Sequence, residues 1–194
     1  MEDDPALTPE EGHTVHSESV ANALLRLLRL LQEEALTWED GLPVSASEPY
    51  IYTFAAVSGT QRVRFQNFLA DRAWSSTEIT AATNLPLMSA ALQQKLQLTT
   101  SSALSAPQLI ALMREDFGIP ESFSAQDARM VLGVLYEVSL RKLAKGAATT
   151  PYFLGEDIPA DLISILNDGH YTGAVIGSRS VRQYHTDYAA HLLG

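Results

Sequence analysis

The chain has 194 residues, a hydrophobic content of 46% and a formal net charge of −10. This length fits one domain, and the apolar content is sufficient for a sizeable core. The absence of cysteine excludes disulfides, thiolate metal ligands and a cysteine nucleophile. No apolar run reaches the length of a membrane span, so we expect no membrane contact and a location in the cytoplasm or in a particle, such as a virion, assembled inside the cell.

The negative charge is concentrated at the start of the chain. Residues 1–18 carry six acids and no Lys or Arg, and without them the net charge of −10 becomes −4. We therefore expect residues 1–16 to form a flexible acidic tail and residues 17–194 to form a single helical domain. An acidic chain attracts nucleic acid poorly, but its ten arginines outnumber its three lysines, and the guanidinium fork suits phosphate.

The strongest predicted helix follows this tail and begins with a cap at Ser17 or Ser19. It has a broad apolar stripe at helical spacing, which needs burial on two sides. The stripe consists of Val20, Leu24, Leu27, Leu28, Leu31 and Ala35, widened by Leu25, Leu30 and Leu36. Arg29 and Glu33 stand one turn apart, where an exposed ion pair would form.

A loop is predicted over residues 37–49, which contain Gly41, Pro43 and Pro49. Residues 50–57 fit either a short strand or the first turns of a helix, and we favour the helix. The next helix is expected over residues 61–74. Its buried face would consist of Phe65, Phe68, Leu69 and Ala73.

Two capping boxes mark the starts of later helices. Ser75 with Glu78 predicts a short helix that ends before Pro86, and Ser105 with Gln108 predicts a helix that ends at Gly118. Between them, residues 87–98 continue the helical spacing through Met88, Leu92 and Leu96.

Three further helices are expected in the last third of the chain. One begins at the cap Ser124 and closes at Gly146, a short one starts at Asp157 or Pro159 and ends at Gly169, and the last runs from Ser178 to the C-terminus. The sequence therefore predicts an all-α fold, a compact bundle of about seven helices with at most one short β-hairpin. It leaves open whether residues 50–57 and 171–176 are extended.

Two groups of residues are candidates for contact with phosphate or single-stranded nucleic acid. Ser178, Arg179 and Arg182 follow the glycine-rich segment 169–177 and would bind an anion at a helix N-terminus. The alternative is a tight connection between two helices. Arg62 and Arg64 would contact a nucleic acid backbone, and the alternative there is an ordinary solvated helix face.

A third group of residues suggests self-association. Leu24, Leu27, Leu28 and Leu31 form the apolar stripe of the first helix, and Tyr184 and Tyr188 form an aromatic pair on the last one. Apolar ridges that one copy leaves uncovered would pack against another copy, so we expect a homo-oligomer.

Three function classes remain. The sequence has no P-loop, no Gly-x-Ser-x-Gly elbow and no Ser-x-x-Lys motif, and we assign it no cofactor, metal or catalytic residue. The favoured class is a non-enzymatic assembly subunit of the helical coat or nucleocapsid type, which contacts nucleic acid through a few arginines. The alternatives are an intracellular adaptor or effector that binds another protein through an apolar helix face, and an enzyme whose site is assembled from distant residues.

Overall fold

A computed structural model describes residues 9–56, 58–75, 85–98, 102–143, 151–169 and 175–178. The side chains of the first helix are described from Val20 onward. The chain divides into two compact units, residues 1–158 and residues 159–194. Each unit is described by itself below, and the single domain expected over 17–194 stays a prediction.

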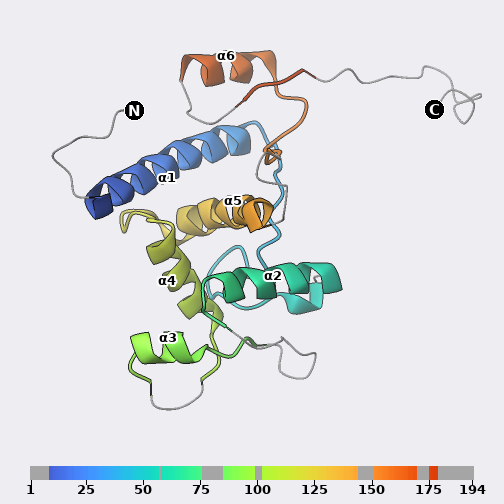
Figure 1. The fold of residues 1–194 in the computed structure, drawn as a ribbon. Helices are drawn as coiled ribbons and strands as arrows, with labels where there is room; N and C mark the ends of the chain where they lie inside the picture. Colours follow the sequence, from blue (N-terminus) through green and yellow to red (C-terminus); the bar gives the residue numbers. More distant parts are fainter. Residues whose placement is uncertain are drawn as a thin grey trace, which may run out of the picture. The chain divides into compact units, whose positions relative to one another are not determined.

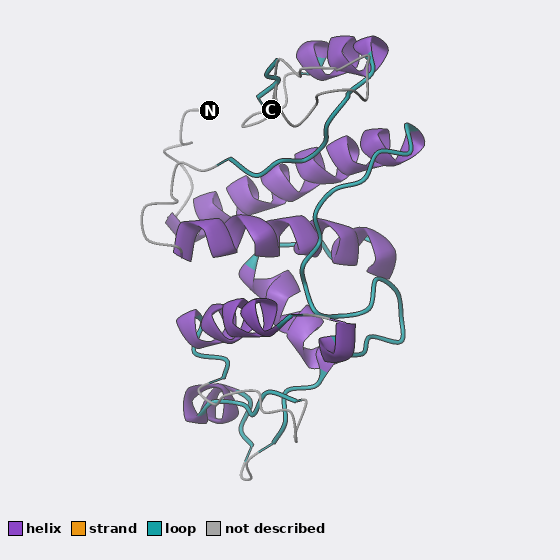
Figure 2. Cartoon of the chain, turned by 90° about the vertical axis from the view of Figure 1, so that its right-hand side faces the viewer, coloured by secondary structure: helices purple, strands orange, loops and turns teal. Residues whose placement is uncertain are grey.

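The described residues confirm the all-α prediction. Figures 1 and 2 show helices joined by loops, and the only β-type pairings in the described residues are isolated bridges, Val44 with Tyr52, Ser75 with Met88 and Leu87 with Ala103. The elements are α1 (Pro9–Glu33), the 3-10 helix η1 (Phe54–Ala56), α2 (Gly59–Asp71), α3 (Ala90–Lys95), α4 (Ala106–Asp116), α5 (Ala125–Leu143) and α6 (Ala160–Asp168).

Helix α1 begins earlier than the sequence suggested. It starts at Pro9, so Ser17 and Ser19 lie inside the helix and do not cap it. Proline suits the first turn of a helix, which agrees with Pro9 as the first residue of α1. The Arg29 side chain pairs with Asp127 of α5 at 3.0 Å and not with Glu33, because α1 packs against α5.

The helix favoured for residues 50–57 was wrong for most of this segment. The chain is extended through Tyr52, which bridges to Val44, and only then forms the single turn η1. Helix α2 follows, capped by Ser58 and Gln61, and it buries Phe65, Phe68 and Leu69 as predicted. Ala73 is exposed, with a φ of 52°, because α2 has ended before it.

The predicted caps of α4 and α5 are confirmed. The Gln108 side chain accepts hydrogen bonds from the Ser105 N–H at 3.0 Å and from its hydroxyl at 2.7 Å, and Gly118, with a φ of 60°, follows the end of α4. The Ser124 hydroxyl accepts the Asp127 N–H at the start of α5. Helix α3 is shorter than predicted, and it leaves Leu96 40% exposed beyond its end.

In the unit that begins at Pro159, α6 confirms the short helix expected to end at Gly169. Glu78 of the first capping box, Gly146, residues 171–174 and the last predicted helix after Ser178 lie outside the described residues. Within residues 1–158, helix α5 is the centre of the packing, because α1, α2 and α4 all contact it.

Candidate functional site

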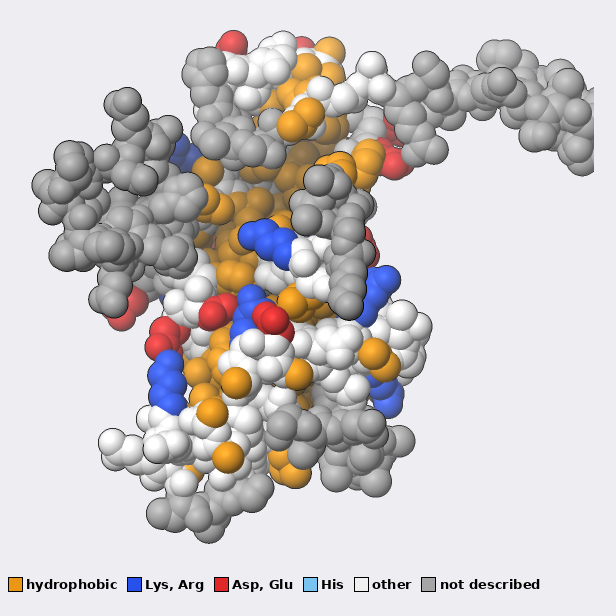
Figure 3. All heavy atoms as spheres, viewed as in Figure 1, with side chains coloured by type: hydrophobic (Ala, Val, Ile, Leu, Met, Phe, Trp, Pro, Cys, Tyr) orange, Lys and Arg blue, Asp and Glu red, His pale blue; other side chains and the backbone are white. Residues whose placement is uncertain are grey.

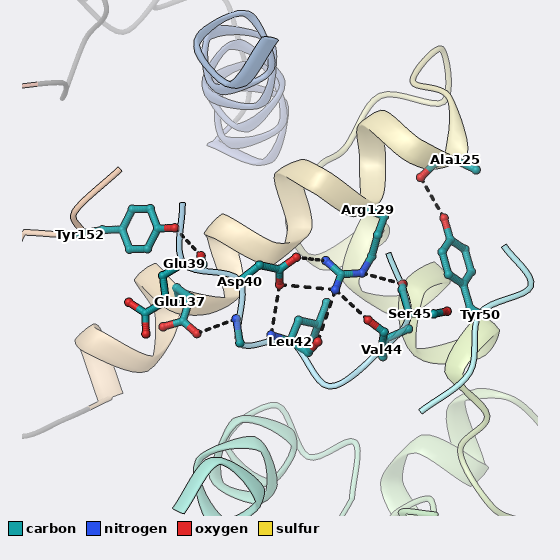
Figure 4. Close-up of polar contacts among 11 residues, drawn as sticks. Glu39, Asp40, Leu42, Val44, Ser45, Tyr50, Ala125, Arg129, Glu137 and Tyr152 are labelled. Carbon is teal, nitrogen blue, oxygen red and sulfur yellow. Dashed lines mark hydrogen bonds and ion pairs between the residues drawn. The ribbon is translucent and has the colours of Figure 1, made fainter. Parts of the chain in front are cut away.

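A buried arginine joins α5 to the segment that follows α1 (Figure 4). The Arg129 residue is 3% exposed, and its guanidinium binds the Asp40 carboxylate at 2.8 Å. It also donates to the backbone carbonyls of Ser45 at 3.1 Å, Val44 at 2.8 Å and Leu42 at 3.3 Å. A buried guanidinium needs partners of this kind for its donors, so Arg129 fixes the path of residues 40–45.

A second set of polar contacts lies further along α5. The buried Glu137 carboxylate accepts the Gly41 N–H at 3.1 Å and pairs with Arg141 at 2.9 Å. Arg141 also binds the Glu39 carboxylate at 2.9 Å, and the Tyr152 hydroxyl donates to the Glu39 carbonyl. Burial raises the pKa of the Glu137 carboxyl, while the hydrogen bond from Arg141 opposes that shift.

We call Glu39, Asp40, Arg129, Glu137 and Arg141 the loop clamp. Every fully buried side-chain nitrogen or oxygen in the described residues has a hydrogen-bond partner. The buried nitrogen and oxygen atoms of the loop clamp are therefore all satisfied by the chain itself, and these contacts hold the loop against α5.

A groove lies where the C-terminal ends of α2 and α4 meet α5 and the middle of α1. Its volume is about 400 Å³. The residues that line this α5 groove are Val20, Asp71, Arg72, Asp116, Phe117, Leu135, Val138, Ser139, Lys142 and Leu143. On the face drawn in Figure 3, apolar side chains gather near the middle with basic and acidic groups beside them.

Arg72 forms the charged wall of the α5 groove. Its guanidinium lies 4.0 Å from the centre of the Phe68 ring and 5.2 Å from that of Phe117. It pairs with Asp116 at 2.8 Å and with Asp71 at 3.6 Å, which are the last residues of α4 and α2. A cation at two helix C-terminal ends is favoured by both dipoles, so Arg72 is fully engaged by its own chain.

Lys142 differs from Arg72, because no carboxylate of the described residues forms an ion pair with it. Its side chain is exposed at the last turn of α5. Close to it in the lining, Val20 is 43% exposed, and Leu135, Val138 and Leu143 are half-buried. The α5 groove thus offers a partly exposed apolar surface and a cation without an ion pair to any described carboxylate.

The leucine stripe on α1 is mainly core. Leu27, Leu28 and Leu31 are 8%, 0% and 1% exposed, and only Leu24 of the four candidates is half-buried. Three of the four are thus buried within the chain itself, and contact of the stripe with a second copy stays a prediction.

Three of the five candidate phosphate contacts, Arg62, Arg64 and Ser178, lie within the described residues. Arg62 is half-buried and donates to the Phe54 carbonyl at 2.6 Å, whereas Arg64 is exposed on α2. Ser178 is exposed in an irregular segment of the other unit. Arg179, Arg182, Tyr184 and Tyr188 lie outside the described residues, so their roles stay predictions.

The α5 groove was not found from the sequence. Its lining comes from four helices, and no spacing rule connects Val20 to Arg72 or Phe117. The one available signal was Lys142, a basic residue in the last turn of an apolar helix, which also fits a simple helix-end charge.

Comparisons with known proteins add no relative: no protein-family model, no curated protein and no solved structure matches this chain. Within the described residues no cluster of three His, Asp or Glu side chains is placed to hold a metal ion. None of the described helices combines the length and apolar character that a bilayer crossing requires.

Proposed function

We propose that this chain is a self-associating structural subunit that binds a second copy of itself through the α5 groove. The observation that carries the proposal is the exposure of Val20, at 43%, in a groove formed by four helices that Lys142 also lines, without an ion pair to any described carboxylate. An apolar centre with charged groups at its rim is the usual composition of a protein–protein interface.

The apolar side chains of the groove keep enough accessible surface for association to be favourable. Val20, Leu135, Val138 and Leu143 all keep part of their surface accessible. Removing apolar surface from water contributes about 25 cal/mol per Å², so a side chain inserted among these residues would add to affinity from both partners. Rigid helices form the walls, which limits the conformational entropy that binding costs.

The alternative function is that of an adaptor that binds a different protein through the same groove. The burial of Leu27, Leu28 and Leu31 favours it, because the core of residues 1–158 is closed without a second copy. The two functions use one surface and differ in the occupant.

Contact with single-stranded nucleic acid stays a prediction. Four of the described arginines, Arg29, Arg72, Arg129 and Arg141, are paired with carboxylates of the same chain. Arg64 on α2 is exposed and has no such pair among the described residues, so it keeps its charge available for phosphate, as does Arg26 on α1.

Sedimentation equilibrium over a wide concentration range tests the proposed self-association. We expect the wild-type chain to form dimers or larger species and Val20→Asp to sediment as a monomer, because a carboxylate would be buried against the groove. The matched control is Val63→Asp on α2, at a site that is 53% exposed and does not line the groove. A wild-type chain that is monomeric throughout would contradict self-association and favour the adaptor.

A further inference from the structure

We infer that a hollow beside the loop clamp binds a small organic cation of the quaternary ammonium class. This aromatic hollow lies between the segment that follows α1 and the segment that precedes α6, and its described lining belongs to residues 1–158. The lining consists of Ala35, Leu36, Thr37, Trp38, Glu39, Phe153, Gly155 and Glu156. None of these residues lines the α5 groove, so the inference goes beyond the proposed function.

The walls of the aromatic hollow are held in place by the loop clamp. The Tyr152 hydroxyl donates to the Glu39 carbonyl, and the Arg141 guanidinium lies 4.9 Å from the centre of the Tyr152 ring (Figure 4). These contacts fasten the two segments to each other, which limits the entropy that binding costs. The volume of the hollow is about 420 Å³, within the range of about 300–1,000 Å³ that is usual for small-molecule sites.

Two aromatic side chains line the hollow. Trp38 is half-buried, and Phe153 is 61% exposed, which makes it the only exposed aromatic residue in the described part of the chain. The face of an aromatic ring attracts a cation, and the recognition of quaternary ammonium groups is the best-known use of this attraction. The aromatic rings of the lining therefore suit a ligand with a weakly hydrated positive charge.

The formal charges around the aromatic hollow are negative in sum. Glu39 and Glu156 line it, and no described lining residue is a Lys or an Arg. Glu39 is paired with Arg141, but the loop clamp has three carboxylates and two guanidinium groups, so that with Glu156 its formal charge is −2. Burial, and then the carboxylates of the loop clamp, raise the pKa of the Tyr152 hydroxyl, while Arg141 opposes the shift. A cation is the ligand that complements this charge.

The absence of N–H groups distinguishes a quaternary ammonium from other organic cations. It is bound by ring faces and by charge, and the aromatic hollow offers both. A primary ammonium or a guanidinium needs fixed hydrogen-bond acceptors as well. The buried acceptors of the loop clamp are already engaged by the Gly41 N–H and by Arg129.

Titration of the full-length chain with choline, followed by NMR at low salt, tests this inference. Choline and 3,3-dimethylbutan-1-ol have the same shape, and only choline is charged. We therefore expect choline to bind at least about tenfold more tightly than the neutral compound. A failure of choline to bind in the millimolar range, or equal affinities for the two compounds, would overturn the inference.

Variants of the lining locate the binding. Phe153→Leu should weaken choline binding about tenfold, whereas Phe153→Tyr keeps a ring face and should bind nearly as the wild type does. Glu156→Gln should also weaken binding, and its matched control is Glu121→Gln, the same charge change at an exposed position outside the hollow. Circular dichroism checks that each variant keeps its helices.

Equal affinities of Phe153→Leu and Phe153→Tyr, or of Glu156→Gln and Glu121→Gln, would contradict a site in the aromatic hollow. None of these outcomes bears on the proposed self-association, because that function is tested separately at Val20 in the α5 groove.

Discussion

The two sides of α5 differ in how completely the chain satisfies its own polar groups. Arg129, Glu137 and Arg141 on one side are occupied by residues 39–45 and by each other. Val138 and Lys142 lie on the opposite side by helical spacing and line the α5 groove. A saturated cluster fixes the fold, whereas a partly exposed apolar surface, beside a lysine that pairs with no carboxylate of the described residues, suits the binding proposed above. The loop clamp is therefore the part of α5 that stabilises the fold.

The largest expected effect comes from removing the guanidinium of the loop clamp. Arg129→Met would leave the Asp40 carboxylate and the carbonyls of Val44 and Ser45 without their donor. Breaking a buried ion pair from one side costs about 3–5 kcal/mol, and we expect a loss of this size in urea unfolding. Arg26→Met, at an exposed position on α1, is the control. A similar small effect of both changes would mean that the loop clamp does not stabilise the fold.

A smaller effect is expected at Gly133, where α5 packs against Asp40. A Cβ added at Gly133 would lie 2.7 Å from the Asp40 carboxylate, which Arg129 holds in place. Overpacking of this kind costs about 1–3 kcal/mol, which outweighs the gain of up to about 1 kcal/mol in helix propensity. We therefore expect Gly133→Ala to lower the free energy of unfolding.

Gly59→Ala provides the contrast for that measurement. A Cβ at Gly59 meets nothing within 4 Å, so this variant should be neutral or slightly more stable than the wild type. Equal stability of Gly133→Ala and Gly59→Ala would show that the contact between Gly133 and Asp40 is not tight.

The smallest expected effect is a change in pH dependence. Burial raises the pKa of Glu137, so the folded state binds this proton more tightly than the unfolded state does. The contribution of Glu137 to stability therefore falls as the pH rises from its unfolded pKa through its folded pKa. Glu137→Gln should remove that component and give a flatter fall in unfolding free energy above the unfolded pKa. Unfolding curves of both proteins at several pH values would measure the difference, and parallel profiles would contradict it.

The local rules of helix capping predicted many of the helix boundaries. They could not predict the contacts between helices. Ser105, Gln108 and Gly118 mark both ends of α4, because a capping box and a left-handed residue act over three or four positions. The start of α1 was placed at Ser17 or Ser19 because the acids near Pro9 were interpreted as a tail, although they also suit the first turn of a helix.

The buried charge on α5 shows why the candidate site was harder to predict. Arg129 and Asp40 are separated by 89 positions in the chain, so no local pattern connects them. An arginine within the apolar sequence of α5 indicated that a buried guanidinium would need a carboxylate or carbonyl partner. It did not indicate which residue that partner was. The stripe on α1 was correctly identified as apolar, yet periodicity does not distinguish burial in one's own core from burial against another copy.

The loop clamp also defines a sequence motif. Arg129, Gly133, Glu137 and Arg141 recur every fourth residue along α5, and they meet the tripeptide Glu39-Asp40-Gly41. A distant relative that keeps this interlock should carry Glu-Asp-Gly early in its chain and Arg-x-x-x-Gly-x-x-x-Glu-x-x-x-Arg on a later helix. These two motifs together could identify such a relative even where the overall sequence identity is too low to detect it.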